Sequence, residues 1–448
     1  MTDPAAWLDA ADYRQGLSWF RRFAPYISAH RGRTFVVYLG GEAVAAKGFQ
    51  AFLNDLARLS TLGIRLVLVH GLRPQIDAAL ARHGVTARYH QGLRITDALS
   101  LACVKEAAGT VRVEIEAQLS MGLPHAPRHS PRLRVTSGNF VTARPVGVLN
   151  GIDLGQTGEV RRIDREGLEN ALDRGDIVLL SAVGYSPSGE IFNLRSEAVA
   201  TEVAIALQAD KLILFGETPC RVDPEGPLIR QLTSEEAEGL LARLGPEEAT
   251  LKRQLEAAIT ATQAGVRRCH CLCYEDESAL LLELFTRDGI GTLISQTPFE
   301  LLRPAEVSDI PGILGLLLPL EADGILVPRS RERLESDIED FLVLDRDGLI
   351  VGCGALHRFE DFPMAEVAGL ALDPDYQAEG RGSRLLAALE ARAKALGLSA
   401  VFALSTQTQD WFKERGYRPS PPDTLPEARR QRMAPGRNSK VLIKQFKA

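Results

Sequence analysis

Cysteine is scarce in this sequence, which also lacks long apolar runs and a marked excess of charge of either sign. Six cysteines among 448 residues are too few for a disulfide framework, so we expect reduced thiols and a cytoplasmic protein. The longest uncharged apolar stretch, residues 310–320, contains two prolines and is too short to cross a bilayer. The first residues are acidic and lack the apolar core of a signal peptide. We therefore expect no membrane partner.

The charge balance also limits the partners of the protein. A net charge of −6 does not provide the basic surface with which proteins bind nucleic acid, so we expect no nucleic-acid partner. An acidic small-molecule substrate is still possible, because a few local arginines decide its binding. The other proportions, 45% hydrophobic and 25% charged residues, are those of a globular protein. A length of 448 residues favours two or three domains.

The residue pattern predicts an α/β protein with two differently organised domains. Over residues 34–297, short apolar strands such as TFVVYL and IRLVLVH alternate with amphipathic helices. This alternation predicts an open, mainly parallel sheet with helices on both faces. A short linker at residues 296–298 then leads to an antiparallel-rich α+β domain over residues 303–448. Its first helix is predicted in the stretch PAEVSDIPGILGLLLPL, residues 304–320.

A glycine-rich loop in the second domain is the strongest local signal. In DPDYQAEGRGSRLL, residues 373–386, a strand ends at Leu372 and a helix starts near Gly382. The unpaired amides of the first helical turn, together with the charge of Arg381, could hold a pyrophosphate. An ordinary glycine turn is the alternative for such a loop. A Rossmann fingerprint is disfavoured, because it requires a third glycine where Leu385 stands.

The surroundings of this loop resemble the acetyl-CoA motif Q/R-x-x-G-x-G/A of the Gcn5-related N-acetyltransferase (GNAT) family. The preceding strand AEVAGLALD and the later run WFKERGY, residues 411–417, match that family as well. The resemblance implies that acetyl-CoA is the cosubstrate. Where many GNAT members have a tyrosine as general acid, this sequence has Trp411 and Phe412, so another proton donor is needed. The implied acetyl-CoA contacts are Leu370, Ala371, Leu372, Gln377, Gly380, Arg381, Gly382 and Ser383.

Three further runs resemble the bacterial N-acetylglutamate synthase family, namely ILVPRSRE at 325–332, LSTQTQDWFKERGY at 404–417 and NSKVL at 438–442. That family joins an amino-acid kinase-like domain to a GNAT domain. The resemblance implies that L-glutamate is the acceptor. It also implies that Arg329 and Arg437 hold the two carboxylates, because guanidinium groups bind carboxylates bidentately, and that Lys440 is a possible third contact. Solvated surface residues are the alternative for each of these cations.

The same resemblance assigns the acetyl-transfer chemistry. Glu366 would take the proton from the amine of glutamate, and a backbone amide near Gly369 or Leu370 would meet the oxyanion. Ser405 would then protonate the departing thiolate. An exposed strand carboxylate and a satisfied hydroxyl are the alternatives for Glu366 and Ser405. Cys353 raises the possibility of an acetyl-cysteine intermediate, but a small buried cysteine and direct transfer are the favoured interpretation.

The first domain resembles the amino-acid kinase family, but it differs at the positions that contact phosphate. Its first strand ends in Tyr38-Leu39-Gly40-Gly41, where the family has K-x-G-G with a lysine that reaches ATP. The family's H-G-G-G-P run is HGLRP at 70–74, and its N-x-N-A-D run is NLRSE at 193–197. Lys211 does match. These departures imply a domain without kinase activity, so we expect no ATP.

Arginine-sensitive members of the kinase family have a C-terminal region resembling GVRRCH at 265–270 and LLELFTRDGIGT at 281–292. The resemblance implies that His270, Glu283 and Gly289 contact an L-arginine effector. For Glu283 the alternative is an ordinary helix-face carboxylate four residues before Arg287. Alternating Cys269, Cys271 and Cys273 could suggest zinc, but structural zinc uses C-x₂₋₄-C pairs and four ligands. Three buried thiols and no metal are therefore expected.

Residues 1–33 are predicted to form a separate helical arm that joins subunits. Residues 13–26 form an amphipathic pattern whose aromatic side chains would be poorly covered on a monomer. In arginine-sensitive relatives a similar helix interlaces a hexameric ring, which implies a homo-oligomer here and a hexamer in particular. Packing of this helix on its own domain is the alternative.

Together the resemblances imply an enzyme of amino-acid biosynthesis that makes N-acetyl-L-glutamate, the first step of arginine biosynthesis, under allosteric inhibition by L-arginine. A bifunctional synthase and kinase is one alternative, which the loss of the lysine at Tyr38 disfavours. A non-catalytic arginine-sensing regulatory protein is another, and the intact glycine loop disfavours it. An acetyltransferase for a different amine is the third.

Overall fold

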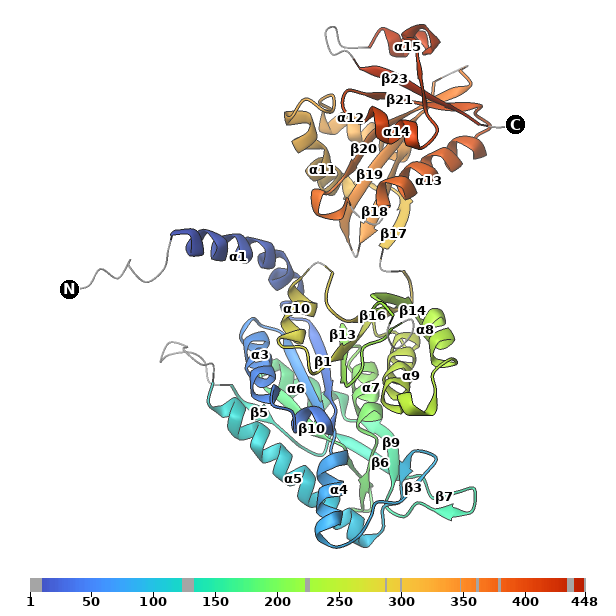
Figure 1. The fold of residues 1–448 in the computed structure, drawn as a ribbon. Helices are drawn as coiled ribbons and strands as arrows, with labels where there is room; N and C mark the ends of the chain where they lie inside the picture. Colours follow the sequence, from blue (N-terminus) through green and yellow to red (C-terminus); the bar gives the residue numbers. More distant parts are fainter. Residues whose placement is uncertain are drawn as a thin grey trace, which may run out of the picture. The chain divides into compact units, whose positions relative to one another are not determined.

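The computed structural model describes residues 10–122, 133–221, 226–286, 288–298, 300–346, 348–359, 362–377, 380–432 and 439–446. The chain divides into two compact units, residues 1–298 and 299–448, which are described separately below (Figure 1). Arg437 and Arg287, which the sequence analysis singled out, lie outside the described residues. No helix in the described ranges combines the length and apolar character that a membrane crossing requires.

The first unit is built on an eight-stranded sheet with the order β14-β16-β15-β13-β1-β2-β10-β5. All of its neighbouring strands run parallel except β15 and β16, so the predicted open, mainly parallel sheet is confirmed. The strands are β1 (Thr34–Leu39), β2 (Arg65–His70), β5 (Val135–Thr136), β10 (Ile177–Ser181), β13 (Lys211–Gly216), β14 (Gln231–Thr233), β15 (Arg268–Cys273) and β16 (Thr292–Ser295).

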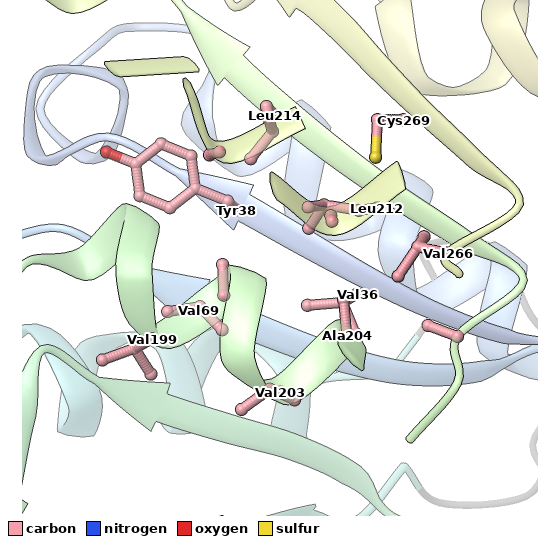
Figure 2. Close-up of a cluster of buried hydrophobic side chains, with 14 of the residues drawn as sticks. Val36, Tyr38, Val69, Val199, Val203, Ala204, Leu212, Leu214, Val266 and Cys269 are labelled. Carbon is pink, nitrogen blue, oxygen red and sulfur yellow. The ribbon is translucent and has the colours of Figure 1, made fainter. Parts of the chain in front are cut away.

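Helices cover both faces of this sheet and enclose two separate hydrophobic cores. Alternate residues of the central strand β1 point to opposite faces, so Val36 enters one core and Val37 the other. Figure 2 shows the first core, where Val199 and Val203 of α7 lie against Val36 and Val69 of the sheet. The helices on that side are α6 (Arg165–Asp173), α7 (Ser196–Ala206), α8 (Ser234–Leu241) and α9 (Ala249–Gln263). Those on the other side are α3 (Phe49–Thr61), α4 (Arg73–Arg82), α5 (Ala98–Ser120) and α10 (Ala279–Phe285).

Smaller elements complete the first unit. A four-stranded sheet with the order β12-β11-β6-β9 lies beside the main one, and two short hairpins, β3-β4 and β7-β8, extend from the same part of the chain (Figure 1). The strands are β3 (Tyr89–His90), β4 (Leu93–Arg94), β6 (Val141–Pro145), β7 (Val148–Leu149), β8 (Ile152–Asp153), β9 (Gly158–Ile163), β11 (Val183–Tyr185) and β12 (Ile191–Asn193). The short helix α2 (Gly41–Val44) and the 3₁₀ turn η2 (Pro246–Glu248) complete this set.

The predicted N-terminal helix is present as α1 (Ala10–His30), and it is longer than the sequence pattern indicated. Its C-terminal half packs on its own unit, because the His30 ring bonds to the carbonyl of Leu284 at 2.9 Å and Phe23 meets Phe285 edge to face. Trp19 and Phe20, near its middle, are 53% and 62% exposed. The C-terminal half of α1 thus packs on its own domain, as the alternative interpretation predicted. Trp19 and Phe20, nearer its N-terminus, remain largely exposed within the described chain.

The second unit is a seven-stranded sheet with the order β17-β18-β19-β20-β21-β23-β22. Every neighbouring pair is antiparallel except β20 and β21, which run parallel, so the predicted antiparallel-rich α+β fold is confirmed. The strands are β17 (Glu300–Pro304), β18 (Phe341–Arg346), β19 (Leu349–His357), β20 (Met364–Leu372), β21 (Ala400–Ser405), β22 (Arg418–Ser420) and β23 (Lys440–Gln445).

Helices pack on both faces of this sheet as well. The long helix α13 (Arg381–Ala395) covers one face through Leu385 and Leu389, and α11 (Ile310–Ala322) covers the other through Ile313 and Leu317. The remaining short helices are α12 (Arg331–Ser336), α14 (Gln409–Glu414) and α15 (Glu427–Arg430). The 3₁₀ turns are η3 (Val307–Asp309), η4 (Ile338–Asp340), η5 (Pro374–Tyr376) and η6 (Pro422–Thr424).

The predicted helix over residues 304–320 is wrong at its start. Residues 300–304 form the edge strand β17, and α11 begins only at Ile310 after the turn η3. Arg303 explains the difference, because its guanidinium bonds to Asp309 at 2.7 Å and 2.9 Å and to Asp345 of β18 at 2.8 Å. The contact with Asp345, 42 residues away, holds the segment against the sheet, and the contacts with Asp309 fix the turn before α11.

Candidate active site

The parallel pair β20 and β21 separates partway along its length. The two strands are paired only from Met364 with Ala400 to Val367 with Ala403. Beyond that point β21 continues beside β23, where Ser405 lies opposite Lys440. The part of β20 from Ala368 onward keeps β19 as its only strand neighbour among the described residues. Its free edge lines a cleft of about 1730 Å³, which is large enough for a cofactor together with a small substrate.

A β-bulge at Gly369 shapes the floor of this cleft. Cys353 of β19 pairs with Ala371, whereas Ala355 pairs with Ala368, so β20 contains one extra residue there. Gly369 has a φ of +58°, a left-handed conformation that favours glycine. A Cβ atom on Gly369 would also lie 3.0 Å from Nη1 of Arg329. The bulge therefore opens the backbone to the cleft and makes room for a guanidinium beside it.

Arg329 is the candidate substrate cation that lies on this floor. Its side chain rests near the ring of Phe341, 5.9 Å away, and lines the cleft beside Gly369. Burial lowers its pKa, and the nearby charge of Glu366 opposes that effect. Among the described residues its guanidinium forms no ion pair, which leaves it available for an anion. Lys440 is exposed at the start of β23, and the neighbouring Ser439 lines the cleft.

Glu366, the predicted base, is buried on β20 and is held by a partner that the sequence did not indicate. Nε and Nη2 of Arg429 donate to its two carboxylate oxygens at 2.6 Å and 2.9 Å. Both side chains are largely buried, with exposures of 9% for Glu366 and 18% for Arg429. Arg429 stands in the arginine-rich run EARRQR, which reads as a solvated surface, so no pattern along the chain marks it.

The structure separates the two candidate reactive groups, because the Ser405 hydroxyl lies in the cleft and the Cys353 thiol is buried. The Ser405 hydroxyl lies in the cleft, 2.8 Å from the hydroxyl of Thr408, and accepts a hydrogen bond from the Thr408 amide. Cys353 is fully buried and directs its thiol to the carbonyl of Gly369. Burial raises the pKa of the Cys353 thiol to about 12, so the nucleophilic thiolate is nearly absent at neutral pH.

The glycine loop and the first turn of α13 form the other wall of the cleft. Gln377, Gly380, Gly382 and Ser383 all line it, and the first amides of the helix are free of intrahelical acceptors. The Arg381 side chain does not join them. It is buried on the sheet side of the helix, where Nε donates to Glu300 of β17 at 2.6 Å.

A different arginine lines the cleft beside the first turn of α13. Arg415 lines the cleft, donates from Nε to the Ser383 hydroxyl at 3.0 Å and lies 4.0 Å from the centre of the Trp411 ring. Trp411 also packs close to Gly382, where a Cβ would lie 3.3 Å from its ring. Arg415 was not predicted as a site residue, although it belongs to the WFKERGY run that resembles the GNAT family.

The region that corresponds to the phosphate-contacting positions of the kinase family is largely filled. Tyr38 is buried at the end of β1, and its hydroxyl lies 3.5 Å from the hydroxyl of Ser196. Leu72 is buried as well, and Arg253 bonds to Glu197 at 2.9 Å across the same region. The hollow that remains measures about 90 Å³, well below the roughly 300–1,000 Å³ of ordinary ligand pockets.

His270, Glu283 and Gly289, predicted to bind arginine, are brought together in the first unit. Nδ1 of His270 donates to Glu283 at 2.6 Å, and the amides of Ile290 and Gly291 donate to the other carboxylate oxygen at 2.7 Å and 2.8 Å. Burial would raise the pKa of Glu283, but these hydrogen bonds lower it to about 2. Gly289 has a φ of +61°, and a Cβ there would lie 2.3 Å from the carboxylate, so only glycine fits.

Lys211, which the kinase resemblance retained, joins this cluster. Its ammonium lies 3.3 Å from Nε2 of His270, so the ring accepts from Lys211 and donates to Glu283. Burial and the charge of Lys211 together lower the pKa of His270 to about 4. Burial and the charge of Arg268 lower the pKa of Lys211 to about 7.

The three alternating cysteines are buried on one strand, as expected. Cys269, Cys271 and Cys273 are all buried on β15, and burial raises the pKa of Cys269 above its ordinary range. Within the described ranges, no group of three or more histidine, cysteine or acidic side chains is arranged to hold a metal ion.

Two family models match separate parts of this chain. The amino acid kinase family model matches residues 33–273, more than half of the sequence. The acetyltransferase (GNAT) family model matches residues 317–417, which include the splayed strand and the glycine loop.

Relatives match nearly the whole chain. An amino-acid acetyltransferase of Ectopseudomonas mendocina is 52% identical over 428 residues, which cover 96% of this chain and 99% of the relative. One of Azotobacter vinelandii is 52% identical over 431 residues with the same coverage. The structure of N-acetylglutamate synthase from Neisseria gonorrhoeae complexed with coenzyme A and L-arginine is 40% identical, covers 96% of this chain and 99% of that one, and has a TM-score of 0.87. A structure of the synthase from that organism complexed with coenzyme A and N-acetyl-glutamate has a TM-score of 0.61 at the same identity and coverage.

Proposed function

This chain belongs to the amino-acid acetyltransferase family, and it is similar to a solved N-acetylglutamate synthase. We propose that its cleft beside β20 transfers acetyl from acetyl-CoA directly to the amine of L-glutamate. The observation that carries this proposal is the separation of β20 from β21. It exposes backbone groups of β20 to one cleft that also contains Glu366, Arg329, Ser405 and the first turn of α13.

Acetyl-CoA would bind along the free edge of β20 and at the start of α13. Backbone groups of Leu370, Ala371 and Leu372 would hold the pantetheine arm, as a neighbouring strand would. The pyrophosphate would meet the amides of the first helical turn, including that of Arg381, with Gln377, Gly380, Gly382 and Ser383 beside it. Arg415 would supply the positive charge at this position.

The chemistry requires a base, an oxyanion site and an acid. Glu366 would accept the proton of the glutamate ammonium, directly or through one water, and the freed amine would attack the thioester carbon. Backbone amides at the Gly369 bulge would stabilise the oxyanion. As the intermediate collapses, the C–S bond breaks, and Ser405 would protonate the CoA thiolate. Cys353 takes no part, because its thiol is buried and protonated.

The carboxylates of glutamate would be held by cations around the cleft. Arg329, which has no ion-pair partner among the described residues, lies on the floor beside Gly369 and would bind one of them bidentately. As the family resemblance implies, Arg437 would hold the other carboxylate, and Lys440 is a possible third contact. A dicarboxylate would thus be preferred over amino acids with neutral side chains.

Residues 34–297 would regulate the enzyme, residues 303–448 would catalyse, and residues 1–33 would join subunits into a hexamer. L-Arginine would bind at His270, Glu283 and Gly289 and inhibit acetyl transfer. Glu283 favours this proposal because it is a buried, ionised carboxylate, the partner that a guanidinium requires. The small hollow at Tyr38 gives ATP no room, so no kinase activity is expected.

The test is release of CoA from acetyl-CoA with L-glutamate as acceptor, repeated at increasing L-arginine concentrations. Release that arginine suppresses is the expected result. Release without a response to arginine would leave the synthase and reject the effector site. No release with glutamate would reject the proposed acceptor, and phosphorylation of N-acetylglutamate from ATP would contradict the loss of kinase activity.

A further inference from the structure

The proposed reaction releases one proton for every acetyl group transferred, and that proton needs a way out of the cleft. An ammonium and a thioester give an amide, a thiol and one proton, so Glu366 must lose a proton before the next turnover. Its side chain is only 9% exposed, and Nε and Nη2 of Arg429 engage both carboxylate oxygens. A carboxylate has about four lone-pair sites, so about two are left for a proton or a water. The proton therefore needs an acceptor close to Glu366.

His357 is the neighbour of Glu366 on the adjacent strand. The two residues lie directly opposite each other in the antiparallel pair of β19 and β20, so their Cβ atoms are about 4.5–5.5 Å apart on one face of the sheet. The flanking residues Ala365 and Val367 enter the core on the α13 side. The His357 ring instead meets Phe341, which belongs to the core on the α11 side, edge to face at 6.3 Å. Both His357 and Glu366 line the cleft.

The His357 ring is oriented to accept a proton at Nε2. Nδ1 lies 2.7 Å from a carboxylate oxygen of Asp340, and because an ionised carboxylate only accepts, Nδ1 carries the hydrogen. A neutral imidazole of this tautomer has its free lone pair on Nε2, which has no hydrogen-bond partner among the described residues. Asp340 is 34% exposed, and Arg358, which follows His357, is exposed as well. This end of the cleft therefore reaches solvent.

We propose, resting on the function proposed above, that His357 accepts, through one water, the proton that Glu366 takes from the substrate ammonium and passes it to solvent. An N–H bond of the ammonium breaks and an O–H bond forms on Glu366. The water then transfers a proton to Nε2, and Glu366 is a carboxylate again. Asp340 stabilises the imidazolium until it releases its proton to solvent. The second proton that the nitrogen loses ends on the thiol of CoA, so the protons balance.

The test measures kcat and KM by CoA release for the native full chain and for His357→Ala, His357→Gln and Asp340→Asn. Glu339→Gln is the matched control, because Glu339 precedes Asp340, is exposed and does not line the cleft. His357→Ala is also assayed with added imidazole and with pyrazole, a ring of the same size that is far less basic. Thermal unfolding shows whether each variant is folded.

In His357→Ala and His357→Gln, kcat should fall by about 100-fold, the lower end of what a positioned proton acceptor contributes. KM for glutamate and for acetyl-CoA should stay within about twofold, because His357 contacts neither molecule. Asp340→Asn should lower kcat by a smaller factor. Imidazole should raise kcat of His357→Ala by about tenfold, because it supplies the missing acceptor, whereas pyrazole should not. Glu339→Gln should leave kcat and KM unchanged.

Other outcomes reject the proposal. An unchanged kcat in His357→Gln overturns it. Equal recovery with imidazole and pyrazole overturns it too, because filling the space would then be sufficient. A loss of kcat that imidazole does not restore also overturns it, and a raised KM with a lower unfolding midpoint would make His357 a structural link between β19 and η4. A native protein that does not acetylate glutamate rejects the proposed function itself, and this inference falls with it.

Discussion

The Gly369 bulge offers a direct way to test how Arg329 is positioned. We expect Gly369→Ala to weaken glutamate binding, although the added methyl group carries no charge and replaces no contact. Gly369 has a φ of +58°, where a residue with a Cβ costs about 1–2 kcal/mol. The new Cβ would also lie 3.0 Å from Nη1 of Arg329, so the guanidinium must shift by a few tenths of an ångström. The conformational cost lowers the free energy of unfolding, whereas the shift of the Arg329 guanidinium weakens the binding of glutamate.

The two effects can be separated by a control. Gly397, at the end of α13, has a φ of +75° with no atom within 4 Å of a Cβ, and it does not line the cleft. Gly397→Ala therefore carries the conformational cost alone. Both variants should lower the unfolding midpoint of the second unit by about 2–8 °C, at about 2–4 °C per kcal/mol. Only Gly369→Ala should raise KM for glutamate, by about tenfold if one charge-assisted hydrogen bond is lost.

The assay measures thermal unfolding together with KM for glutamate and for acetyl-CoA in the two variants. Equal destabilisation with an unchanged KM for glutamate in Gly369→Ala would refute the assignment of Arg329 to a substrate carboxylate. A matching rise of KM in Gly397→Ala would show that the effect comes from lost stability and not from the bulge.

Three other predictions follow from the buried groups. Cys353→Ala should keep kcat within about twofold, because a thiol with a pKa of about 12 supplies little thiolate; a Cys353-dependent acyl burst, lost together with activity, would show covalent transfer. Gly289→Ala should abolish the response to L-arginine while transfer without arginine continues, since its Cβ would lie 2.3 Å from the Glu283 carboxylate; a normal arginine titration would place the effector elsewhere. His30, His70 and His270 are buried, and burial lowers the pKa of each from 6.5 to about 4, so the folded protein binds fewer protons than the unfolded chain between these values. The stability contributed by these histidines is therefore complete above pH 6.5 and is lost as the pH falls toward 4. Thermal unfolding measured across this range should show that His70→Gln reduces the fall in the unfolding midpoint by about a third, since one of three such groups is removed. An unchanged pH profile in this variant would contradict the prediction.

Local patterns were sufficient wherever the determining interactions join residues close in sequence. The alternation of apolar strands and amphipathic helices predicted the parallel sheet of the first unit, because side-chain direction repeats every two residues in a strand and every 3.6 in a helix. The glycines at 380 and 382 predicted the loop before α13 for a similar reason, since backbone conformation there depends on the residues themselves. The alternating cysteines likewise indicated the buried strand β15.

Patterns along the chain failed where long side chains find partners from distant segments. Arg381 was expected at the phosphate, but Glu300, 81 residues away, holds it on the sheet, and Arg415 lines the cleft beside Ser383 instead. The strand β17 was missed, because Arg303 is held by Asp345 from another strand.

The amino-acid sequence alone was enough to determine the two sheet architectures and the glycine loop, and its resemblance to the GNAT family proposed Glu366 as the base. Only the tertiary structure decided what surrounds that base. Glu366 and Arg429 are 63 residues apart, and no periodicity connects them. They meet because the chain that follows β22 returns over the separated strands before β23 joins the sheet. A long, flexible arginine side chain forms an ion pair with a carboxylate that the fold places near it. Its partner therefore depends on the tertiary structure and cannot be inferred from its neighbours in sequence.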